Sequence, residues 1–139
     1  MTGDNQTIGG GGFHHAAIRA HDFDASLKFY GETLGFREKI AWGEGDKRAI
    51  MMDTGDGNYI EIFAGGTTGP KPEGAILHFA IRTDNCDAAL ERARAAGVEV
   101  TMEPESIDIQ SRPAPTAVRI AFFKGPDGEV IELLQNEVT

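Results

Sequence analysis

The sequence has few of the features found in disulfide-stabilised, secreted or membrane-spanning proteins. Cys86 is the single cysteine among the 139 residues, so the chain cannot form an internal disulfide and must be stabilised by packing. No apolar run approaches the roughly 20 residues that cross a bilayer. Residues 1–12 have neither the basic nor the apolar segment of a secretory signal. We therefore expect a cytoplasmic protein.

Positive charge is also scarce. Lys and Arg total 13 against 22 Asp and Glu, which gives a formal net charge of −9 at pH 7. Nucleic acids and anionic membranes require a basic surface, so we expect neither as a partner. A small anionic substrate is compatible with this charge, because a few arginines can dominate one pocket. The composition, with 40% hydrophobic and 25% charged residues, is that of an ordinary globular protein.

What the sequence does contain is an internal repeat. Residues 14–27 (HHAAIRAHDFDASL) and 77–90 (LHFAIRTDNCDAAL) share His-x-Ala-Ile-Arg, with His15 and His78 offset by 63 residues. A second pair of similar segments lies at residues 56–63 (DGNYIEIF) and 127–134 (DGEVIELL). The offset between Glu61 and Glu132 is 71 residues, so the second copy has eight more residues between its His motif and its Glu motif. Each half presents one His near its start and one Glu near its end.

The periodicity predicts the same order of elements in both halves: a strand, a helix and three strands. In the first half we expect strands at about 15–20, 36–42, 47–53 and 58–64, and a helix that begins at Asp22 and ends at Gly35. In the second half we expect strands at about 75–82, 98–103, 116–123 and 129–135, and a helix from Asn85 to Gly97. Residues 104–115, with three prolines, are expected to form a long loop near the site.

This order predicts an α+β fold of two paired βαβββ modules in one domain over residues 13–135. Module 1 covers residues 13–64 and module 2 covers residues 75–135. The Gly- and Pro-rich segment 65–74 is the expected linker, and residues 1–12 the expected flexible tail. Each sheet buries one face under its helix and leaves the other open, so that pairing of modules can cover it.

The repeated His and Glu residues are the candidate site. Glu61 and Glu132 each lie inside an apolar strand, where a carboxylate is costly unless it is paired or binds a cation. Strand alternation directs them away from their apolar neighbours, onto the open face together with His15 and His78. Two imidazoles and two carboxylates suit a divalent transition metal: Zn, Ni or Co first, then Mn or Fe.

Each of these residues also has a plainer interpretation. A single His in a strand is usually a satisfied core or surface group, and a mid-strand Glu usually lies on a solvated face. Recurrence at matched positions favours the metal site instead. His14 and His21 are interpreted as structural or solvated, and Cys86 as a small core residue on the second helix.

The segments SLKFYGETLGF, ILHFAIR and GPDGEVIEL resemble signatures of the vicinal oxygen chelate superfamily (glyoxalase/bleomycin resistance/dioxygenase), and within it glyoxalase I. The resemblance covers residues 13–135 and implies paired βαβββ modules around a metal in a homodimer. It places His15, Glu61, His78 and Glu132 on the four metal-ligand positions. Arg19 matches an arginine that holds the glutathione carboxylate. The glutathione-binding segments of that enzyme have no match at residues 63–66 and 110–114.

The resemblance implies a metal-dependent, lactoylglutathione-lyase-like enzyme that acts on an α-oxygenated carbonyl, such as a hemithioacetal of methylglyoxal. A proton would move between adjacent carbons through a metal-bound enediolate, with Glu132 or Glu61 as the base. Arg19, Arg82 or Arg112 would hold an anionic part of the substrate. The alternatives are an acyl-CoA epimerase of the methylmalonyl-CoA type, an extradiol-type dioxygenase and a non-catalytic small-molecule-binding protein. The sequence leaves open whether one chain or two build the site.

Overall fold

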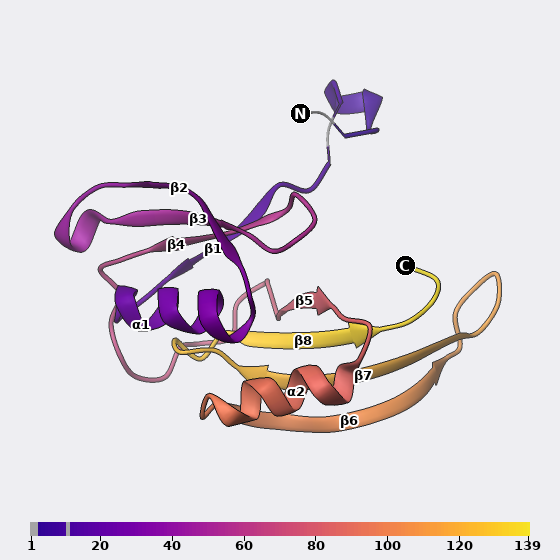
Figure 1. Ribbon diagram of the computed structural model, residues 1–139. Coiled ribbons are helices and arrows are strands. Elements are labelled where there is room, and N and C mark those ends of the chain that lie inside the picture. The colour runs from indigo at the N-terminus through magenta and orange to yellow at the C-terminus, as the bar shows by residue number, and fades with distance from the viewer. Residues whose placement is uncertain (1–2, 11) are drawn as a thin grey trace.

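Two four-stranded sheets, one from each half of the sequence, form the computed structural model, which describes residues 3–10 and 12–139 (Figure 1). The strand orders are β1-β4-β3-β2 and β5-β8-β7-β6, so both modules have the same topology. In each sheet the first strand runs parallel to the last, and the other neighbours are antiparallel. The predicted α+β fold of two βαβββ modules is confirmed.

Module 1 follows the predicted order. Its strands are β1 (His15–Arg19), β2 (Arg37–Trp42), β3 (Ala49–Asp53) and β4 (Tyr59–Phe63), and its helix α1 (Phe23–Lys28) continues as a π-helix, η2 (Phe29–Thr33). The Asp22 carboxylate caps α1 by accepting the Ala25 N–H at 3.0 Å. Gly35 follows η2 with a φ of 75°, a conformation that favours glycine. Short 3-10 turns lie at Gln6–Ile8 and Gly45–Lys47. Within the tail predicted over residues 1–12, residues 1, 2 and 11 lie outside the described residues.

Module 2 departs from the prediction at its long loop. Its elements are β5 (Phe79–Arg82), α2 (Cys86–Ala95), β6 (Glu99–Ile109), β7 (Thr116–Lys124) and β8 (Val130–Gln135). Strand β6 continues through the first half of the predicted loop 104–115, because Ile107 pairs with Val118 and Ile109 pairs with Thr116. The loop is therefore confined to residues 110–115. The strand predicted at 75–82 begins only at Phe79, directly after His78.

A single hydrophobic core joins the modules. Buried side chains of α1, η2 and the first sheet belong to the same cluster as Cys86, Leu90 and Ala93 of α2, all three fully buried. The Phe29 and Phe123 rings meet edge-on across the modules at 6.3 Å between centroids. The apolar strand residues that alternate with the glutamates face this core, so each sheet has one core face and one opposite face, termed the open face below.

Polar contacts also connect the modules. The Asp127 carboxylate, in the turn between β7 and β8, accepts the His21 backbone N–H at 2.8 Å and contacts His21 Nδ1 at 2.9 Å. Arg92 of α2 donates to the carbonyls of Thr33 and Glu32 at 2.6 and 2.8 Å. These contacts satisfy backbone groups at both ends of the α1–η2 segment, where a helix leaves them unpaired. The relative placement of the modules is thereby constrained.

Candidate functional site

Glu61 lies in an apolar row that crosses the open face of the first sheet. The strand register pairs Ile40 with Met51, Met51 with Glu61, and Glu61 with Ala17. Directly paired residues point to the same side of a sheet, so these four side chains share the open face. His15 lies on the same face of β1, and its Nε2 is 3.5 Å from Glu61 Oε1. The parallel pairing of β1 with β4 brings these two residues together.

Glu132 occupies the equivalent position in the second sheet. Its row pairs Met102 with Phe122, Phe122 with Glu132, and Glu132 with Ala80. His78 precedes β5, and its Nε2 lies 2.9 Å from Glu132 Oε2. The His78 ring also meets the Phe122 ring edge-on, with centroids 5.3 Å apart. Both modules therefore place one His–Glu pair beside two large apolar side chains and one alanine.

The two pairs have nearly the same exposure. The His15 and His78 side chains are 36% and 37% exposed, whereas those of Glu61 and Glu132 are 13% and 14% exposed. A largely buried carboxylate is costly unless it is paired or hydrogen-bonded, and in each pair the histidine Nε2 lies within 3.5 Å of a carboxylate oxygen. Across residues 3–10 and 12–139, however, no three His, Cys, Asp or Glu side chains group closely enough to hold a metal ion. Among these residues the two His–Glu pairs therefore remain separate.

The three arginines predicted to contact substrate have different surroundings. Arg19, on the open face of β1, donates to the Ala64 carbonyl at 3.0 Å and lies over the Phe63 ring at 5.4 Å. Arg112 is exposed in the loop between β6 and β7. Arg82, at the end of β5, extends toward the turn between β3 and β4, where its Nη1 is 3.5 Å from Asp56 Oδ2.

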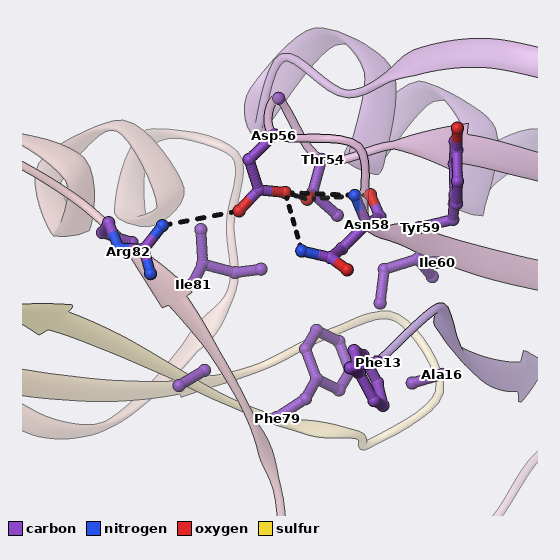
Figure 2. Close-up of a pocket in the computed structure, with 12 residues that line it drawn as sticks. Phe13, Ala16, Thr54, Asp56, Asn58, Tyr59, Ile60, Phe79, Ile81 and Arg82 are labelled. Carbon is purple, nitrogen blue, oxygen red and sulfur yellow. Dashed lines mark hydrogen bonds and ion pairs between the residues drawn. The ribbon is translucent and has the colours of Figure 1, made fainter. Parts of the chain in front are cut away.

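Figure 2 shows this Arg82–Asp56 contact at the edge of a cavity between the modules. The cavity has a volume of about 410 Å³ and is lined by both sheets, with Ile60 from module 1 and Phe79 and Ile81 from module 2. Ile60 alternates with Glu61 along β4 and is buried in the core, so it points to the opposite side of the sheet from the His15–Glu61 pair. The environment of Arg82 is therefore distinct from that of Arg19.

His14 is a contact of His15 that the sequence interpretation missed. The sequence indicated a structural or solvated residue, but His14 directly precedes β1 and its ring turns toward His15. The two Nδ1 atoms are 2.9 Å apart, a hydrogen bond whose donor depends on the tautomers. The consecutive histidines in the sequence were the available signal for this contact.

Comparison with known proteins agrees with the repeated architecture. The family model described as Glyoxalase/Bleomycin resistance protein/Dioxygenase superfamily matches residues 12–133. A probable lactoylglutathione lyase of Vibrio parahaemolyticus is 32% identical over 130 residues, which cover 88% of this chain and 89% of that protein.

Two solved structures have a similar fold. The trypanothione-dependent glyoxalase I of Leishmania major superposes with a TM-score of 0.69 at 28% identity, over 89% of this chain and 86% of that one. TnmS3, an antibiotic binding protein from a Streptomyces species, gives a TM-score of 0.64 at 25% identity, over 91% and 97% of the two chains. The similar proteins thus include both an enzyme and a binding protein.

Proposed function

The chain belongs to the glyoxalase/bleomycin resistance protein/dioxygenase superfamily, and from this premise we propose that it is a metal-dependent, glyoxalase I-like lyase. Its substrate is an α-oxygenated carbonyl of the methylglyoxal hemithioacetal type, and the protein acts in the cytoplasm. The observation that carries the proposal is the His–Glu pair at equivalent positions on the open face of each sheet. Neither pair belongs to the cluster of buried residues that forms the hydrophobic core.

The donor atoms fit a divalent transition metal. Two neutral imidazoles and two carboxylates are ligands for Zn, Ni or Co, and also for Mn or Fe. In each pair a histidine Nε2 and a glutamate oxygen already lie within 3.5 Å of one another. Bound there, the metal would act as a Lewis acid that stabilises negative charge on the substrate oxygens. His15, Glu61, His78 and Glu132 would hold it.

A homodimer would complete this site. Each chain presents two half-sites on separate open faces, and within the described residues they do not combine. A second copy that placed its His78–Glu132 pair against His15–Glu61 would give four ligands and would cover both open faces. Two such sites would form in a two-fold symmetric dimer.

The remaining roles follow from the surroundings of each side chain. Glu132 or Glu61 would move the proton between adjacent substrate carbons, since a carboxylate positioned beside a reacting carbon can act as a general base. Phe122, which pairs directly with Glu132, and Met102, which pairs with Phe122, would keep water from the reacting carbons. Arg19, already held by the Ala64 carbonyl, would bind an anionic group of the substrate without a large loss of side-chain entropy.

The test combines metal analysis with one substitution. The purified protein is expected to contain about one divalent metal per chain, and Glu132→Gln should lower turnover of the hemithioacetal by a factor of roughly 10² to 10⁴, the range of a general base. Glu44→Gln, at an exposed glutamate outside the site, is the control and should keep full activity. A fully active Glu132→Gln protein would exclude that glutamate as the base.

A non-catalytic binding protein is the second candidate function, and the likeness to the antibiotic binding protein TnmS3 favours it. A binder would retain an apolar ligand without turnover and without bound metal. Assays with methylglyoxal and several thiols, with methylmalonyl-CoA in deuterated water, and with catechol and Fe(II) would separate lyase, epimerase and dioxygenase activities. Absence of both metal and turnover would support the binder.

A further inference from the structure

His14 is held in place on two sides. Its carbonyl accepts the backbone N–H of Tyr59 at 2.9 Å, which fixes the main chain just before β1. Its ring lies 5.1 Å from the Tyr59 ring, with 37° between the ring planes. From this position its Nδ1 reaches the Nδ1 of His15 at 2.9 Å. The orientation of the His14 ring is therefore set by Tyr59 and directed at His15.

The His14–His15 hydrogen bond determines which ring nitrogen of His15 can offer a lone pair to a metal ion. A neutral imidazole carries one proton, and the hydrogen bond made by one nitrogen decides whether the other presents a lone pair. The nitrogen that faces Glu61 is Nε2, at 3.5 Å. If the proton is on Nδ1, then Nε2 faces Glu61 with its lone pair exposed, which is the form that a metal ion requires.

We propose that His14 is a positioning residue for His15: its Nδ1 accepts a hydrogen bond from the Nδ1–H of His15 and keeps the Nε2 lone pair of His15 free for the metal. The inference rests on the proposed metal site and extends it to a residue outside the ligand set. Metal-binding histidines in proteins commonly donate their second ring N–H to a carboxylate, a carbonyl or water. Here an imidazole nitrogen is the acceptor.

The second repeat provides an internal comparison. The same 63-residue offset that relates His15 to His78 relates His14 to Leu77, a residue that is 60% exposed and has no side-chain acceptor. The His78 ring contacts the edge of Phe122, at 5.3 Å between centroids. The two histidine ligands therefore differ: His15 has a polar partner for Nδ1, whereas His78 is oriented by an aromatic contact. Substitution at position 14 should affect metal binding, and substitution at position 77 should not.

The experiment compares His14→Leu, which installs the residue of the second repeat, with His14→Asn, which keeps a side-chain acceptor near the Nδ1 position. Leu77→Ala is the matched control. Zn²⁺ affinity is measured on the metal-free full-length proteins by competition with a chromophoric chelator. Loss of a hydrogen-bond partner of a metal-binding histidine typically weakens metal binding by about 10- to 100-fold. We expect this loss in His14→Leu, a smaller loss in His14→Asn, and less than about a twofold change in Leu77→Ala.

A second readout is independent of the metal. ¹⁵N NMR shifts of the His15 ring in the metal-free protein report which nitrogen carries the proton. We expect the Nδ1–H form in the wild type and a shift toward the Nε2–H form in His14→Leu. Wild-type protein that binds no Zn²⁺ would refute the proposed metal site, while the NMR shifts would still test the hydrogen bond. Tight Zn²⁺ binding that is unchanged in His14→Leu would refute the role of His14 alone.

Discussion

Replacing Glu129 by Gln should stabilise the protein at neutral and alkaline pH. Glu129 follows the turn between β7 and β8, and its Oε1 accepts the Asp127 backbone N–H at 2.9 Å. Its Oε2 is buried and, like the Tyr30 hydroxyl, makes no hydrogen bond to any residue that the structure describes. Burial raises the pKa of Glu129 above its ordinary value, an effect that the Asp127 backbone N–H opposes and the Asp127 carboxylate reinforces.

The sign follows from proton uptake. An unfolded glutamate has a pKa of about 4.3, so between that value and the raised pKa of Glu129 the folded protein holds more protons than the unfolded one. The free energy of unfolding therefore falls as pH rises through this window and levels off above the pKa of the folded state. One titrating group limits the slope to about 1.4 kcal/mol per pH unit. Gln does not titrate. The difference in free energy of unfolding between Glu129→Gln and the wild type should therefore increase with pH through this window, by at most about 1.4 kcal/mol per pH unit.

Urea unfolding of both proteins from about pH 4 to about pH 9 measures this difference. Glu44→Gln, at an exposed position, controls for the loss of one surface charge. The reasoning is refuted if Glu129→Gln differs from the wild type by the same free energy at every pH.

Two further predictions concern the contacts between the modules. Asp127→Ala leaves the His21 N–H without its 2.8 Å acceptor and should lower the free energy of unfolding by about 1–3 kcal/mol in urea titrations, with Asp127→Asn losing less. Leu90→Ala should lower it by about 2–5 kcal/mol, since Leu90 is fully buried in the core that both modules share and its removal leaves a cavity. If calorimetry gave a decrease in the free energy of unfolding below about 1 kcal/mol, the neighbouring core residues would have relaxed into the space left by Leu90.

Much of the fold could be predicted because the signals are local. Asp22 and Asn85 cap the helices that follow them, each accepting the N–H three residues later at 3.0 Å, as their positions in the sequence predicted. Strand alternation correctly separated Ile60 and Ile62, which are buried, from Glu61. The prediction of a loop over residues 104–115 was wrong for residues 104–109, which belong to β6. Pro104 indicated a loop, but it lies where the pairing of β6 with β7 is irregular, between Met102 and Glu105.

The sequence by itself determined the repeat, the order of elements and the face of each strand that carries a glutamate, since each depends on residues a few positions apart. Only the tertiary structure decided which residues meet. The parallel pairing of β1 with β4 and of β5 with β8 joins each His to its Glu, and the fold leaves the two pairs separate within the described chain. The contact of His14 with His15 depends on the way the chain enters β1, and the burial of Glu129 depends on module 1. Long-range packing sets both, because Tyr59 of β4 orients the His14 ring and Tyr30 of module 1 lies beside Glu129.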